Sequence, residues 1–181
     1  PIVPESTVVA GRVTLGDNTP CRVIDPFFRV DTYTTVQLVE TDGTAVTDAV
    51  LANAFGDYVL PAVPSGEFNV RATCENTTIE QAVATASSRL VDMTLPNSGP
   101  VISAMVATQA GETVRTVLPG STVTVDAPTV DPDGDAVTYQ WATSTPGFQS
   151  VNASSVQWTL PNTLGLQHLY VQATDSNGGY R

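Results

Sequence analysis

The sequence predicts an all-β fold, arranged as two β-sandwich domains in tandem. Val and Thr each occur 26 times, and both have stiff, branched side chains that suit a pleated, half-buried surface. Apolar and polar residues alternate along most segments, as in Glu67 to Thr73, which indicates strands with one face on a core and one in water. Turn-forming residues recur at intervals of about 8–12 positions, a spacing typical of sandwiches.

Each half of the chain contains a series of such alternating segments. In the first half, strands are expected at residues 8–15, 32–40, 46–53, 57–63, 66–74, 77–84 and 88–95. In the second half, they are expected at residues 101–108, 113–117, 121–127, 136–144, 154–160 and 166–174. Residues 81–88 are rich in small side chains, so a short helix and a strand with a turn both remain open there.

The segment from Pro96 to Pro100 is the clearest boundary between the two halves. Its sequence, PNSGP, combines two prolines with Gly and Ser and has no apolar pattern, which is typical of a short, stiff linker. We therefore expect one sandwich domain over residues 1–96 and a second over residues 97–181.

The charge of the chain excludes several classes of function. The formal net charge is −11 and the pI is near 4.1, so the surface repels nucleic-acid phosphates and anionic lipid. All seven basic residues are Arg, and a chain without Lys can form neither a Lys–Asn isopeptide bond nor a Lys-dependent catalytic site. The remaining roles for the acidity are solubility of an exposed protein or attraction of divalent cations.

Cys21 and Cys74 are the two cysteines, so the chain can form at most one internal disulfide. Sandwich modules rich in Val and Thr usually lie outside the cytosol, where a disulfide persists. We therefore predict a Cys21–Cys74 bridge, which would close a loop of roughly 50 residues and stabilise the fold by about 3–4 kcal/mol. The alternative is a pair of free thiols that behave as small buried apolar side chains.

The first half contains a motif around two turns, formed by Gly56, Tyr58, Leu60, Val63, Pro64, Gly66, Phe68 and Val70. These residues resemble the repeat motif G-x-Y-x-L-x-x-V-P-x-G-x-Y-x-V of the carboxypeptidase-regulatory-like, or transthyretin-like, domain. The first strand of the family is similar to residues 11–15, and its closing V-D-x-x-L is matched at Val91, Asp92 and Leu95. Residues 21–30 depart from the pattern, as an insertion or as an unusually long first connection. The resemblance implies a small, rigid sandwich that is not catalytic and serves as a spacer, stalk or accessory unit.

The second half contains an ordered set of short segments, at residues 99–103, 119–125, 130–135, 137–141 and 173–179. Together they resemble PKD-like and bacterial Ig-like domains. The family pattern implies one more strand after residues 177–181, so we expect this sandwich to lack its last strand and to have an open edge. Either further modules of a longer chain or a strand donated by a neighbouring molecule would fill that edge.

A cluster of three carboxylates occurs at Asp131, Asp133 and Asp135. Such closely spaced carboxylates repel one another unless a cation lies between them, and oxygen ligands suit Ca²⁺. A solvated β-turn with Gly134 at positive φ explains the same residues. We therefore keep both a calcium site, which Asp175 or Asn177 would complete, and a plain turn as predictions. No cofactor is required.

The sequence offers no catalytic set. His168 is the single histidine, which excludes a His-pair metal site, and no nucleophile elbow accompanies it. Trp141 and Trp158 each share a strand face with apolar neighbours, which favours core positions over platforms that stack on sugars. We therefore predict that the protein is not an enzyme.

These features predict a structural or adhesive module pair from a larger extracellular or cell-surface protein, with a fibre or filament as one setting. The alternative is an accessory region of a secreted hydrolase, either a spacer or a part that binds substrate. The expected partners are other domains of the same chain or copies of itself, with a carbohydrate or protein ligand as a further option. Nucleic acid binding and membrane insertion are not expected.

Overall fold

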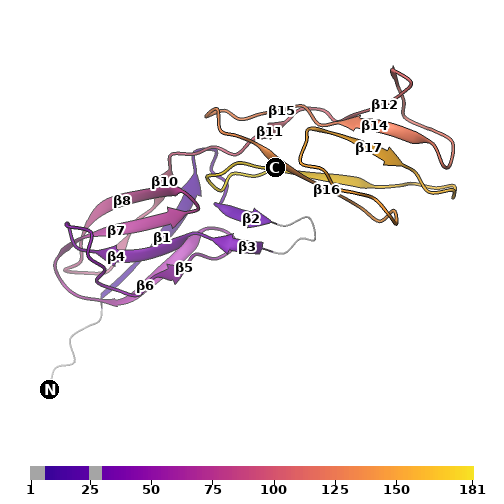
Figure 1. Cartoon of the computed structure of the whole chain (residues 1–181). Coiled ribbons are helices and arrows are strands. Elements are labelled where there is room, and N and C mark those ends of the chain that lie inside the picture. The colour runs from indigo at the N-terminus through magenta and orange to yellow at the C-terminus, as the bar shows by residue number, and fades with distance from the viewer. Residues whose placement is uncertain (1–6, 25–29) are drawn as a thin grey trace. The chain divides into compact units, whose positions relative to one another are not determined.

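The computed structural model describes residues 7–24 and 30–181, and every regular element in those ranges is a β-strand (Figure 1). This confirms the predicted all-β sandwich fold. The described chain divides into two compact units. The first holds β1 to β10, except for the last residue of β2, Ile24, and also includes Ser176–Gly179. The second holds β11 to β18 and the last two residues of the chain. The division after Ser98 falls inside the linker segment. Within the described ranges, no helix has the length and apolar character needed to cross a membrane.

The first unit is built from two sheets. One has the strand order β10-β1-β6, with β9 also paired to β1. Its strands are β1 (Thr7–Leu15), β6 (Asp57–Val63), β9 (Arg89–Leu90) and β10 (Met93–Leu95). The other sheet has the order β5-β4-β7-β8. Its strands are β4 (Thr35–Val39), β5 (Val50–Leu51), β7 (Glu67–Cys74) and β8 (Thr77–Ala84). A separate strand pair joins β2 (Arg22–Ile24) to β3 (Val30–Tyr33).

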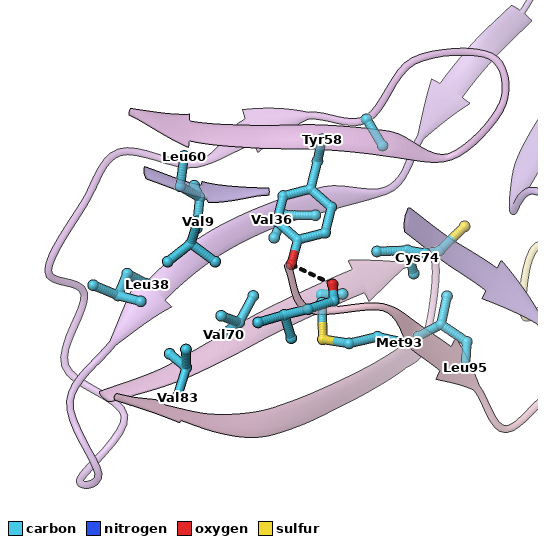
Figure 2. Close-up of a cluster of buried hydrophobic side chains, with 14 of the residues drawn as sticks. Val9, Val36, Leu38, Tyr58, Leu60, Val70, Cys74, Val83, Met93 and Leu95 are labelled. Carbon is cyan, nitrogen blue, oxygen red and sulfur yellow. Dashed lines mark hydrogen bonds between the residues drawn. The ribbon is translucent and has the colours of Figure 1, made fainter. Parts of the chain in front are cut away.

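The core of the first unit lies between these two sheets (Figure 2). Val9, Leu38, Leu60 and Val70 come from four different strands and are fully buried. Along β7, every second residue is buried and those between are exposed or half-buried, because successive side chains of a strand point to opposite faces of the sheet. The alternation seen in the sequence therefore builds the core directly.

The expected strand at 88–95 is divided into β9 and β10 at Val91 and Asp92. The Asp92 Oδ1 accepts the Arg12 main-chain N–H at 2.8 Å, so a side chain occupies the position of a ladder partner. The Val91 carbonyl accepts the Tyr58 hydroxyl at 2.8 Å inside the core. A Cβ on Gly11 would lie 1.9 Å from the Val91 oxygen, so only glycine allows this close approach.

The second unit has a four-stranded sheet in the order β13-β12-β14-β17 and a two-stranded sheet of β16 and β18. The larger sheet consists of β12 (Val106–Gln109), β13 (Glu112–Thr113), β14 (Thr122–Asp126) and β17 (Ser155–Thr159). The smaller sheet consists of β16 (Thr138–Thr143) and β18 (Leu169–Thr174), and a further pair joins β11 (Val101–Ile102) to β15 (Thr129–Val130). Trp141 and Trp158 are buried between the sheets, as the sequence predicts.

Several other expected elements also differ in the structure, and the expected strand at 101–108 is divided into β11 and β12. Of residues 46–53, only β5 is a strand, because the Thr47 hydroxyl takes the Leu38 N–H in place of a main-chain partner. Of residues 113–117, only Thr113 belongs to a strand. Val114 donates its main-chain N–H to the Ala107 carbonyl of β12, and the residues after it no longer pair with that strand. Residues 81–88 form the end of β8 followed by a bend and no helix.

Candidate functional site

The first unit carries an open groove beside β1 and β10 with a volume of about 490 Å³. Its lining combines charged, polar and apolar side chains from both strands and from two loops: Arg12, Thr14, Asn18, Pro20, Phe55, Asp92, Met93 and Thr94. Binding sites for small molecules commonly combine an apolar surface with a few fixed polar groups. This groove is therefore a candidate binding site.

Phe55 lies at the groove on a turn whose backbone is fixed. The Asn53 Oδ1 accepts the main-chain N–H groups of Phe55 at 2.8 Å and of Asp57 at 3.0 Å. Gly56 has a φ of 85°, and a Cβ there would lie 2.2 Å from the Val13 carbonyl oxygen. Only glycine is compatible with both constraints. The turn therefore holds the Phe55 ring at the surface, where 70% of the residue is exposed.

Two charged side chains, Arg12 and Asp92, line the same groove as this ring. Arg12 Nε donates to Asp57 Oδ1 at 2.7 Å, and Asn53 Nδ2 donates to Asp57 Oδ2 at 3.2 Å. These hydrogen bonds, that from Arg12 above all, lower the pKa of the Asp57 carboxyl. The hydrogen bond and the charge of Asp57 raise the pKa of Arg12, to which Asp92 adds a smaller contribution. The lining of the groove thus combines the Arg12 guanidinium and the Asp92 carboxylate with the exposed Phe55 ring.

The three aspartates of the predicted calcium site form a turn in the second unit. Asp131 Oδ1 accepts the main-chain N–H of Asp133 at 2.9 Å and of Asp135 at 3.0 Å, and Gly134 has a φ of 84°. Within residues 7–24 and 30–181, no three His, Cys, Asp or Glu side chains converge as ligands for a metal ion. The second oxygen of Asp131, Oδ2, is buried without a hydrogen-bond partner. The turn accounts for the sequence pattern, and calcium binding stays a prediction.

Cys21 and Cys74 form a disulfide, as predicted. Their Cα atoms are 6.3 Å apart, and both residues are buried in the first unit. Cys74 ends β7, and Cys21 lies between β1 and β2, so the bridge ties the central strand of one sheet to a connection that leaves the other. The role of this pair is structural.

His168 lies on the exposed side of the second unit. Its ring stacks on Tyr170, with centroids 6.1 Å apart and an interplanar angle of 16°. The position agrees with the expected alternation along β18, in which Leu169 and Val171 pack toward the core.

Sequence reasoning did not single out the groove, since its residues are scattered between positions 12 and 94. The local signal is Phe55 between Asn53 and Gly56. A large apolar side chain inside a tight polar turn has no place in the core and must face solvent.

The comparisons with known proteins support part of the predicted identity. Residues 97–181 match the family model of the bacterial Ig domain. No curated protein matches the chain.

Three solved structures are similar to the chain at low identity. A DUF3823 family protein from Bacteroides uniformis has 11% identity and a TM-score of 0.44, with 93% of this chain and 88% of that chain covered. A candidate carbohydrate-binding protein from the same species has 9% identity and a TM-score of 0.40, with 96% and 80% covered. A variant of the major pilin subunit of Bacillus cereus has 14% identity and a TM-score of 0.39, with 97% and 66% covered.

With TM-scores below 0.5, these three structures carry no argument about what the chain binds. The resemblances of the first unit to transthyretin-like domains and of the second to PKD domains stay predictions. The family match supports an Ig-like domain over residues 97–181.

Proposed function

We propose that this chain is a non-catalytic, adhesive part of a larger extracellular or cell-surface protein, and that the groove of the first unit binds carbohydrate. The observation that carries the proposal is the exposed Phe55 ring on its fixed turn beside Arg12 and Asp92. A sugar presents C–H groups on one face of its ring and hydroxyls around the edge, so its binding requires an apolar surface next to donors and acceptors.

The geometry supplies both kinds of contact at little entropic cost. The Phe55 ring offers a flat apolar surface, and its backbone is ordered before any ligand arrives. Arg12 contributes N–H donors, and Asp92 and Asn18 contribute oxygen acceptors in the same groove. Because the groove is open, it suits a chain of sugars that passes along the surface.

Two observations support a location outside the cell. One is the Cys21–Cys74 disulfide, and the other is the match of residues 97–181 to the bacterial Ig domain. A Cys21–Cys74 bridge persists in oxidising compartments and is rarely retained in the cytosol. An accessory region of a secreted hydrolase stays as the alternative setting, in which the same groove would hold polysaccharide for an enzyme domain elsewhere in the protein.

The test is binding of the whole chain to a panel of soluble polysaccharides and immobilised glycans. We expect Phe55→Ala to weaken the affinity for the bound glycan by roughly tenfold, the effect of losing one aromatic contact. Leu90→Ala is the matched control, since Leu90 is also an exposed apolar residue of the first unit, at 84% exposure, and does not line the groove. Equal binding by both variants, or no glycan bound by the wild type, would reject the proposal.

A further inference from the structure

The charges at the Phe55 groove of the first unit are not balanced. The charged side chains of its lining are Arg12 and Asp92, and Arg12 forms an ion pair with Asp57. One positive and two negative side chains therefore give this part of the surface an excess of one negative charge. The way in which the three charges are paired determines which sugars the groove favours.

Asp57 is the counterion of Arg12. Arg12 Nε lies 2.7 Å from Asp57 Oδ1, and Asp57 Oδ2 accepts a hydrogen bond from Asn53 Nδ2 at 3.2 Å. The pKa of Arg12 is raised mainly by Asp57 and less by Asp92. Because Asp57 already balances the guanidinium in the free protein, Arg12 offers a ligand N–H donors without an excess of positive charge.

Asp92 supplies the unbalanced negative charge. Its Oδ1 accepts the main-chain N–H of Arg12 at 2.8 Å, which holds the carboxylate in place on an exposed residue. Within residues 7–24 and 30–181, its Oδ2 accepts no hydrogen bond and the side chain forms no ion pair. The groove therefore contains a positioned carboxylate oxygen that a cationic group of a ligand can contact.

We infer that the groove selects glycans that carry free amino groups over N-acetylated and over acidic glycans. This inference rests on the proposed function and names the class of sugar that the site takes. The ammonium group of an amino sugar brings a positive charge and N–H donors to Asp92, while the ring of the same sugar lies on Phe55. A uronic acid or a sulfated sugar would bring a second negative charge to Asp92 and is disfavoured.

The net charge of the whole chain acts in the same direction as Asp92. At −11, it attracts a polycationic glycan and repels a polyanionic one over a long range. That attraction does not depend on where a single carboxylate lies, whereas contact with Asp92 does. A test of the inference must separate the two contributions.

The experiment uses two ligands with the same sugar ring and the same linkage. Both are hexamers of β-linked glucosamine, one with free amino groups and the other fully N-acetylated. Titration calorimetry of the full chain at low ionic strength, at a mildly acidic pH where the amino groups are protonated, gives the affinity for each. The measured quantity is the ratio of the two affinities.

We expect the wild-type chain to bind the amino hexamer at least about threefold more tightly than the N-acetylated one, the size of one exposed ion pair. Asp92→Asn keeps an oxygen that can accept the Arg12 N–H and removes the charge, so it should lower this preference by about threefold. Arg12→Gln removes the opposing positive charge and should raise the preference.

Asp42→Asn is the matched control. Asp42 belongs to the same unit, and its Oδ1 likewise accepts a main-chain N–H, that of Thr44 at 2.9 Å, but it does not line the groove. The substitution changes the net charge by the same amount, so the preference should stay as in the wild type. Added salt should reduce the wild-type preference, because it screens exposed charges. Phe55→Ala should weaken the binding of both hexamers by the same factor.

Three outcomes would overturn the inference and leave the carbohydrate site in place. The first is equal or tighter binding of the N-acetylated hexamer by the wild type. The second is an equal loss of preference in Asp92→Asn and Asp42→Asn, which would assign the preference to net charge. The third is a wild-type preference that added salt does not reduce.

Two further outcomes would overturn the proposed function together with the inference. One is unchanged binding of both hexamers by Phe55→Ala. The other is a lysine hexapeptide that binds as tightly as the amino hexamer and is weakened as much by Phe55→Ala, which would assign the groove to a cationic peptide.

Discussion

The two units are both sandwiches, but their cores differ in completeness. In the first, two sheets of four strands each face one another, and 18 of the described residues form a single buried apolar cluster. In the second, a four-stranded sheet faces a sheet of two strands, and the corresponding cluster has six members. Another nine apolar residues of the second unit pack against that cluster while partly exposed.

This difference shows how strand count controls burial. Every second side chain of a sheet needs a facing strand to exclude water from it, and a smaller facing sheet leaves more of these side chains partly exposed. Val114, Val117 and Leu160 of the second unit are partly exposed in this way and line a groove of about 400 Å³. The first unit adds a disulfide within its own core, which the second unit does not have.

The largest expected effect is the loss of the disulfide. The double substitution Cys21→Ser with Cys74→Ser should cost the first unit about 4 kcal/mol, since the bridge closes a loop with a sequence separation of 53. Far-UV circular dichroism reports the unfolding of both units, and tryptophan fluorescence reports that of the second alone. A fluorescence transition that moves by as much as the dichroism transition would show that the two units do not unfold independently.

Matched leucine truncations compare the two cores directly. Leu38→Ala removes a fully buried side chain from the first unit and should cost about 3 kcal/mol. Leu160→Ala removes a partly exposed side chain at the groove of the second unit and should cost about 1 kcal/mol, because water already reaches the site. Both free energies of unfolding come from urea denaturation. Similar costs at the two positions would contradict the difference in core completeness.

Acid should weaken the first unit through three surface carboxylates. Hydrogen bonds from Thr44, Arg12 and Arg71 lower the pKa values of Asp42, Asp57 and Glu80 respectively. The ordinary values are 3.8 for Asp and 4.5 for Glu, so the stability that these groups contribute is present above those values. That stability is lost as the pH falls through the lowered values of the folded state.

The melting temperature of the first unit should therefore fall as the pH decreases from about 4.5 toward 3. Glu80→Gln removes the carboxylate that pairs with Arg71 at 2.7 Å, so it should lower the melting temperature at pH 7 and flatten this part of the profile. A variant profile parallel to that of the wild type would reject the assignment to Glu80.

The smallest expected effect is that of calcium on the Asp131 turn. Asp131 Oδ1 is already occupied by two N–H groups, which leaves the buried Oδ2 as the oxygen without a partner. A weak site of this kind would stabilise the second unit by about 0.4 kcal/mol at a calcium concentration equal to its Kd. Tryptophan-monitored melting in millimolar Ca²⁺ and in chelator measures the shift, and Asp131→Asn should abolish it. Identical melting curves with calcium and with chelator would reject the calcium site and identify these residues as a plain β-turn.

The sequence predicts the strands best where the alternation is long. Residues 57–63 and 77–84 form strands over those same ranges, and β7 begins at Glu67, one residue inside the expected 66–74. Short elements are predicted poorly because side chains replace main-chain partners there. The Thr47 hydroxyl and the Asp92 carboxylate each accept a main-chain N–H that a neighbouring strand would otherwise pair with. The alternation of apolar and polar residues does not predict such contacts.

The candidate sites divide in the same way. The Cys21–Cys74 bridge follows from having two cysteines and an extracellular type of composition. The local sequence predicts the turn at Asp131, because the spacing of Asp and Gly favours it. The local sequence does not decide whether a metal ion binds there, since that depends on ligands from other parts of the fold. The groove at Phe55 brings together residues from strands that are far apart in the chain, so only the fold reveals it.

The most direct test of the difference between the units is hydrogen exchange of the unmodified chain at neutral pH. β7 is paired on both sides, with β4 and β8, so the amides of Val70 and Ala72 should exchange slowly. Ala173 exchanges main-chain hydrogen bonds with Arg181, on the side of β18 away from β16, and the amides of Val171 and Leu169 point to that same side. Because the described residues pair this part of β18 with β16 alone, these two amides should exchange orders of magnitude faster. Equal protection at the two pairs of sites would contradict the difference between the two units.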